Sequence, residues 1–204
     1  MDGIYVYWFG WLFWVVVSFF WPKTKKRLGI AALLLVLLIM LPFDISIGHV
    51  SIHFAFICFS IYLFSYLKSN KKRQLFLYFI VTITIAAAYG GFQLLLVFDP
   101  VIEYVDSRWM SASFVALIAF LLAHVLKDRI IVTLIGLVQG ELLTGLTFQQ
   151  YLYMDRAIGS LYFFDVISIV GIIFTTFWVI QRVSSWIANL VVPDQKHGAL
   201  KKSS

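Results

Sequence analysis

The sequence is poor in cysteine, proline and charge, and these shortages exclude several classes of protein. Its 204 residues include one cysteine and four prolines, and only 13% are charged. The single cysteine, Cys58, has no partner for an intrachain disulfide or a cysteine metal site, which argues against a disulfide-stabilised secreted domain. With so few charged side chains, the chain cannot cover itself with the polar surface of an ordinary soluble domain.

Hydrophobic residues instead make up 62% of the chain, and its mean hydropathy is +0.93. The charges fall in short runs between long apolar segments that approach the roughly 17 to 25 residues needed to cross a bilayer as a helix. These segments lack the period-2 alternation of barrel strands, so we expect helices. The prediction is an all-α integral membrane bundle of seven transmembrane helices, at about 3–21, 28–43, 50–67, 74–98, 109–126, 130–154 and 161–181.

The basic residues predict the orientation of this bundle. Alternate connections and the C-terminal tail hold every Lys and Arg of the chain except Arg108 and Arg156. Because Lys and Arg are retained on the cytoplasmic side, the N-terminus is expected outside and the C-terminus inside a bacterial plasma membrane.

The two ends of the chain carry separate expectations. No Lys or Arg precedes the first apolar segment, so it lacks the basic region of a signal peptide and is expected to be retained. Residues 1–182 form the predicted transmembrane domain. Residues 183–204 form a cytoplasmic tail, beginning as either a helix on the membrane surface or the frayed end of the last span.

Glu141 is the most informative single residue. It lies about 11 residues into the sixth segment, near the middle of the bilayer at about 1.5 Å per residue. A carboxylate at this depth has to face protein or water, because burying it in lipid is costly. Glu141 is therefore either a neutral, hydrogen-bonded packing residue or a residue that binds a proton or a cation.

Small and polar residues surround Glu141 on the same helix. Gly136 and Gly140 have GxxxG spacing, and Thr144 extends their stripe, which predicts close packing against another helix. Gln139 adds a further polar side chain.

Three more polar residues lie toward the outer half of the predicted bundle. Asp165 is near the outer start of the seventh span, His53 near that of the third, and Gln93 near the outer end of the fourth. Together with Glu141 they form a candidate intramembrane polar site if the helices bring them together. Taken singly, each is more readily explained as an interfacial or hydrogen-bonded residue.

Familiar chemical motifs are missing. The sequence has no HExxH, no GxSxG turn, no phosphate-binding or dinucleotide glycine pattern and no cysteine cluster. We therefore expect no catalytic residue, no cofactor, no metal site and no enzymatic activity. The basic turns are explained by membrane topology, so no nucleic-acid partner is expected.

The opening segment GIYVYWFGWLFWVVVSFFWPKTKKR, the overall length and the short basic turns resemble the YphA-like membrane proteins of Bacillus and related Firmicutes. The resemblance implies a small polytopic plasma-membrane protein without an assigned activity, so it transfers no functional residue to this chain.

Two functions follow as hypotheses. The first is a structural or accessory protein that works by packing against itself or a partner membrane protein. The second is a small transporter or channel in which Glu141 binds a proton or cation. Glu141→Gln separates them, because it should abolish a pH-dependent flux only in the second case.

Overall fold

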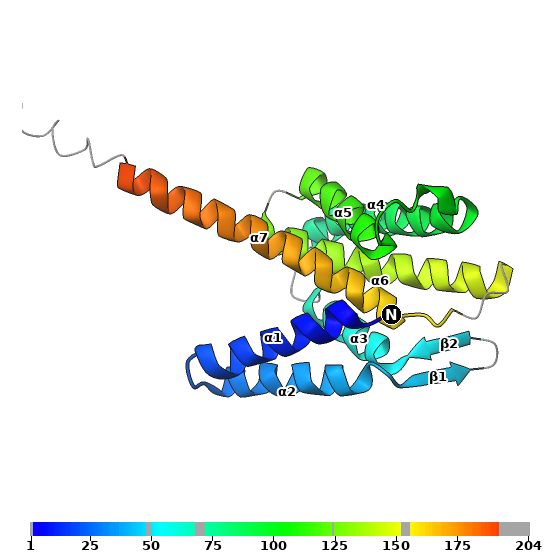
Figure 1. The fold of residues 1–204 in the computed structure, drawn as a ribbon, viewed down its shortest axis with the longest axis horizontal. Helices are drawn as coiled ribbons and strands as arrows, with labels where there is room; N and C mark the ends of the chain where they lie inside the picture. The colour runs from blue at the N-terminus through cyan, green and yellow to red at the C-terminus, as the bar shows by residue number, and fades with distance from the viewer. Residues whose placement is uncertain (1, 48–49, 68–71, 124, 152–155, 192–204) are drawn as a thin grey trace, which may run out of the picture.

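The computed structural model describes residues 2–47, 50–67, 72–123, 125–151 and 156–191 (Figure 1). These residues form a mainly helical chain with one small β-hairpin. In order, the elements are α1 (Ile4–Phe20), α2 (Lys25–Met40), β1 (Asp44–Ile47), β2 (Val50–His53), α3 (Phe54–Leu67), α4 (Lys72–Phe98), the 3-10 turn η1 (Pro100–Ile102), α5 (Ser107–Leu122), α6 (Leu126–Tyr151) and α7 (Leu161–Val191).

Each of the seven predicted segments overlaps one of these helices, but the helices differ in length. Among the described residues, three stretches are long and apolar enough to cross a membrane on their own: Phe76–Phe98, Leu126–Tyr151 and Leu161–Ala188. The apolar helices Ile4–Phe20, Phe54–Ser65 and Ser107–Leu122 are shorter. The chain therefore has membrane-spanning character, and the count of seven spans stays a prediction.

The β-hairpin differs from the all-α prediction and shortens the third segment, because residues 50–53 are strand. β1 and β2 pair antiparallel, with Asp44 opposite His53 and Ile47 opposite Val50. In both strands polar and apolar residues alternate. Hydropathy averaged over a window as long as a membrane span does not detect such a two-residue period. The segment before α7 joins the same sheet, since Ile158 donates its N–H to Ser51 and accepts one from His53, both at 2.9 Å.

Helices α4 and α6 pack closely at the centre of the bundle. A Cβ added to Gly136 would lie 2.7 Å from the Cβ of Ile85, and one added to Gly140 would lie 3.0 Å from the carbonyl oxygen of Ala86. On α4, Thr82, Ala86 and Gly90 repeat at every fourth residue, so small side chains line both sides of the contact. Their size lets the two backbones approach closely enough for extensive van der Waals contact.

The last helix is longer than the predicted seventh segment. α7 continues without a break from Leu161 to Val191 and extends well beyond the rest of the bundle (Figure 1). Residues 183–191 therefore continue the last helix without a break, and their placement relative to the membrane surface stays a prediction. The remainder of the predicted tail, 192–204, lies outside the described residues.

Candidate functional site: two buried carboxylates

Glu141 is enclosed between two helices and the segment that leads into α7. Its side chain is 1% exposed. Oε2 accepts a hydrogen bond from the Tyr89 hydroxyl at 2.9 Å, and Oε1 accepts one from the backbone N–H of Gly159 at 3.1 Å. Both carboxylate oxygens are thus satisfied by donors from outside α6.

Gly159 allows this backbone contact with Glu141. Its φ is +71°, a conformation that glycine adopts without steric cost, and a Cβ there would overlap Phe56 of α3. The polar atoms of a buried, irregular backbone segment need protein partners. The Glu141 carboxylate supplies one such partner.

Further polar side chains gather beside Glu141. Gln93 donates from Nε2 to Ser111 Oγ and to the Tyr162 hydroxyl, each at 3.1 Å, and accepts from Arg156 Nη1 at 3.3 Å. The Arg156 guanidinium lies 4.8 Å from the ring centroid of Tyr162 and interacts electrostatically with Glu141. We call this group the Glu141 cluster; its members are Tyr89, Gln93, Ser111, Glu141, Arg156, Gly159 and Tyr162.

Asp165 belongs to a second group, formed by α7 with the starts of α1 and α5. It is fully buried, and its carboxylate accepts the backbone N–H groups of Gly3 and Val6, each at 2.8 Å. These donors belong to the first turn of α1, whose own side chains provide no cap. Asp165 therefore caps α1 from α7, and its negative charge also suits the positive end of the α1 dipole.

Arg108 supplies the counter-charge to Asp165. Its Nη1 lies 2.9 Å from Asp165 Oδ2, and its Nε lies 2.8 Å from Asp106 Oδ1. The Arg108 guanidinium also lies 5.4 Å from the centre of the Tyr5 ring on α1. The Asp165 cluster, defined as Gly3, Val6, Asp106, Arg108 and Asp165, joins the N-terminal ends of three helices.

Asp106 completes this cluster as the N-cap of α5. Its Oδ1 accepts the backbone N–H of Arg108 at 3.0 Å, which caps the helix. The side-chain hydrogen bond from Arg108 lowers the pKa of Asp106 below its ordinary value, since it stabilises the charged carboxylate.

The structure divides the predicted polar site. Glu141 and Gln93 share one cluster, Asp165 lies in the other, and His53 has Nδ1 3.1 Å from the carbonyl oxygen of Leu41. His53 still interacts electrostatically with Glu141. Gln139 belongs to neither cluster, and its buried Oε1 has no hydrogen-bond partner. The packing residues Gly136, Gly140 and Thr144 all lie on the face of α6 toward α4.

Sequence reasoning missed the arginines of both clusters. Arg108 and Arg156 were treated only as the two exceptions to the charge asymmetry, yet each interacts with a buried carboxylate. The available signal was their position in the predicted outer connections, which hold few Lys or Arg. An arginine that occurs there, against the usual preference for the cytoplasmic side, needs a structural reason. Tyr89, Tyr162 and Ser111 gave no signal among so many aromatic and small residues.

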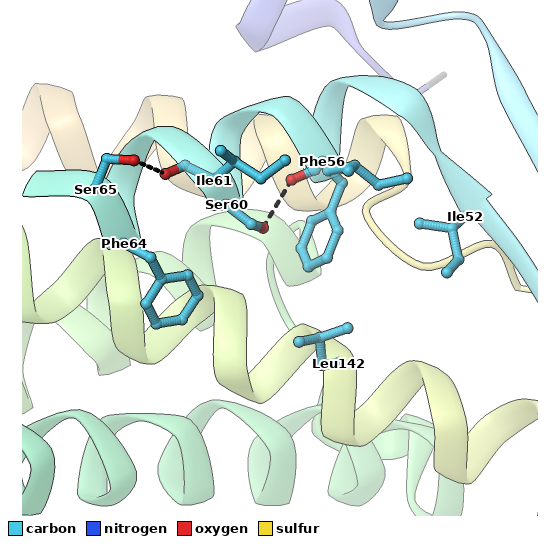
Figure 2. Close-up of a pocket in the computed structure, with 8 residues that line it drawn as sticks. Ile52, Phe56, Ser60, Ile61, Phe64, Ser65 and Leu142 are labelled. Atoms are coloured by element: carbon cyan, nitrogen blue, oxygen red, sulfur yellow. Dashed lines mark hydrogen bonds between the residues drawn. The ribbon is translucent and has the colours of Figure 1, made fainter.

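An apolar groove of about 560 Å³ lies beside the Glu141 cluster, between α3 and α6 (Figure 2). Phe56, Ile61 and Phe64 line one side, and Leu142 of α6 lies opposite. The hydroxyls of Ser60 and Ser65 donate to the carbonyls of Phe56 and Ile61 within α3, at 2.7 and 2.8 Å. The lining therefore suits apolar groups such as lipid chains, and Glu141 is not part of it.

The described residues include no group of three or more His, Cys, Asp or Glu placed to hold a metal ion. Long apolar helices around two buried polar clusters define the chain as a helical integral membrane protein.

Comparison with known proteins identifies the family. A family model described as "YphA-like integral membrane protein" matches residues 2–201, so the chain belongs to the YphA-like integral membrane family. It is also 27% identical over 154 residues to "Uncharacterized protein YphA" of Bacillus subtilis (strain 168), covering 74% of each chain. No solved structure matches the chain significantly.

Proposed function

We propose that the chain is a seven-span protein of the bacterial plasma membrane, with its N-terminus outside and its C-terminus in the cytoplasm, and that its role is structural or accessory and not enzymatic. The observation that carries the role is the enclosure of Glu141. A carboxylate that is 1% exposed and bonded to Tyr89 and Gly159 holds the segment before α7 against α4 and α6. Such a carboxylate stabilises the fold without exchanging a ligand.

The orientation is supported by the positions of the helix ends. The N-terminal ends of α1, α5 and α7 meet in the Asp165 cluster, so these three helices begin on one side of the bundle. This is the side that carries few basic residues in the sequence. The opposite ends lead into the basic connections, which agrees with cytoplasmic retention of Lys and Arg.

A transporter or channel is the second proposal, favoured by the polar groups around Glu141. Arg156 and His53 interact with Glu141 electrostatically, and Arg156 Nη2 is buried without a hydrogen-bond partner. Intramembrane ionisable groups of this kind commonly mark proton or ion paths.

Glu141→Gln and Glu141→Leu, assayed in proteoliposomes and in a deletion strain, test the two proposals. The accessory role predicts that Glu141→Gln complements the deletion, since an amide of the same shape still accepts from Gly159. It predicts that Glu141→Leu fails through loss of folded protein, measured by gel filtration in detergent. If Glu141→Gln abolishes a pH-dependent flux while its yield of folded protein stays at the wild-type level, the accessory role is wrong.

A further inference from the structure

The end of α7 presents an apolar face that no described element covers. The start of α1 lies beside Asp165 of α7, because Asp165 accepts hydrogen bonds from Gly3 and Val6. α1 has 17 residues, and the same number of residues counted from Asp165 ends at Arg182. The rest of α7, about nine residues or roughly 14 Å, therefore extends past the end of α1.

The α5–α6 connection gives a second measure of where the bundle ends. The guanidinium of Arg129, in the first turn of α6, lies 5.9 Å from the centre of the Phe177 ring. Arg129 lies in the basic connection Lys127–Arg129, so Phe177 is already near the predicted cytoplasmic surface. By either measure, residues 183–191 extend past the point where the neighbouring helices end.

This extension is nevertheless apolar along one stripe. Thr176, Ile180, Val183 and Ile187 are spaced by four, three and four residues, and in the sequence Leu190 continues the spacing. The four residues are exposed, with Ile180 at 59% and Ile187 at 49%. Spacing of this kind places the residues at the a and d positions of heptads, the pattern by which helices pair along a seam.

The continuity of α7 argues against burial of this stripe in the membrane surface. A helix that turns to lie on the surface needs a break, and sharp kinks occur mainly at proline, glycine or a disrupted turn. No proline or glycine lies between Gly171 and Pro193, and α7 runs unbroken to Val191 (Figure 1). The helix therefore carries the second half of the stripe, Val183 and Ile187, straight past the end of the bundle.

We infer that the stripe Thr176, Ile180, Val183 and Ile187 pairs with the same stripe of a second copy, so that two α7 helices form a short parallel coiled coil at the cytoplasmic surface. Copies inserted in one membrane share an orientation, so their α7 helices run parallel. Ile180 and Ile187 occupy a positions, where β-branched residues favour two-stranded parallel pairing. Arg182 falls at a c position outside the seam, so the pairing brings no like charges together.

This inference rests on the proposed membrane placement. It names the surface through which the proposed accessory protein associates with itself. The first test uses disulfide formation in full-length protein in membranes, starting from Cys58→Ser to remove the native thiol. Val183→Cys and Ile187→Cys place thiols in the seam, and Ser185→Cys, an exposed position between them, is the matched control. Mild oxidation should give a covalent dimer for the two seam variants and none for the control, because a disulfide needs Cα atoms about 4.4–6.8 Å apart.

The second test uses mass in detergent, where the wild-type protein is expected at twice the chain mass of 23.5 kDa. The double change Val183→Asp and Ile187→Asp should halve that mass, whereas Ser185→Asp should leave it unchanged. Equal crosslinking at Ser185→Cys and Ile187→Cys would overturn the seam. A second result would also overturn it: no crosslinks form, and a water-soluble thiol reagent does not label Ile187→Cys in vesicles. That result would place the stripe on the lipid surface.

The two proposals fail separately. A pH-dependent flux lost in Glu141→Gln would overturn the accessory role and leave the crosslinking pattern intact. A monomeric wild-type protein would overturn the seam and leave the result for Glu141 unchanged.

Discussion

The two buried carboxylates of this protein are stabilised in different ways. Asp165 has a direct ion pair with Arg108 and two backbone N–H donors, whereas Glu141 has a tyrosine hydroxyl and one backbone N–H. Arg156 is the cation of the Glu141 cluster, but its Nη1 donates to Gln93 and not to Glu141. Removing one partner of a buried ion pair leaves an uncompensated charge, while removing a neutral donor leaves only an unmet hydrogen bond. The Asp165 cluster should therefore be the more sensitive of the two.

The largest effect is expected for Asp165→Asn. The amide keeps the shape of the side chain, but it removes the fully buried one of the two carboxylates that contact Arg108 and offers one oxygen to two N–H donors. The free energy of unfolding in detergent should fall by about 3–5 kcal/mol, measured by denaturant titration. Asp2→Asn is the control, since Asp2 is largely exposed and its carboxylate lies 3.8 Å from Arg108. A loss for Asp165→Asn no larger than for this control would remove the contrast between the clusters.

Glu141→Leu should have a smaller effect. It leaves the Tyr89 hydroxyl and the Gly159 N–H without an acceptor, at roughly 1–3 kcal/mol each. Glu141→Gln should lose less, because its oxygen can accept from Gly159 while its amide donates to the Tyr89 hydroxyl. The same denaturant titration measures both variants, and a loss for Glu141→Gln as large as for Glu141→Leu would show that the charge itself matters.

Gly140→Ala tests whether the α4–α6 contact supports the Glu141 cluster. The new methyl group would lie 2.9 Å from the Tyr89 ring and 3.0 Å from the carbonyl oxygen of Ala86, so α4 has to move. We expect a loss of about 1–3 kcal/mol. Gly91→Ala is the matched control on α4, where an added Cβ meets nothing within 4 Å, and it should be neutral or stabilising. Equal losses in thermal unfolding would contradict this packing.

The smallest effect is expected from acid, through Asp106. The hydrogen bond from Arg108 lowers its pKa, so its contribution to stability is present above the unfolded-state pKa of about 3.9 and is lost as the pH falls through the lower folded value. Wild-type protein should lose slightly more stability than Asp106→Asn between about pH 4 and pH 2. Parallel unfolding curves of the two proteins across this range would show that the ion pair contributes nothing.

The sequence anticipated the helices better than the polar contacts. Long apolar runs predicted a helix in each of the seven segments, since helices are the structure that satisfies backbone groups in lipid. The hairpin was missed because Asp44–Ile47 and Val50–His53 are each four residues long, too short to register in a window suited to spans. The small residues Gly136 and Gly140 were correctly singled out as unusual, but their neighbours Ile85 and Ala86 could not be named in advance.

The polar site shows the same limit. Glu141 and Asp165 stood out because a carboxylate in an apolar run is costly to leave unpaired. Their partners did not stand out, because the hydrogen bonds join residues as far apart in the chain as Gly3 and Asp165. Arg108 and Arg156 were visible as exceptions to the charge rule, but the rule itself gives no reason to pair each with a particular acid.

Hydropathy and charge along the chain were enough to predict a membrane protein of helical class, because insertion into lipid depends on local composition. They also carried the family resemblance. Which carboxylate receives a cation, which loop carries Gly159 to Glu141, and where α7 leaves its neighbours were decided only by the packed structure. Those outcomes depend on distances between segments remote in sequence, and one-dimensional patterns do not contain such distances.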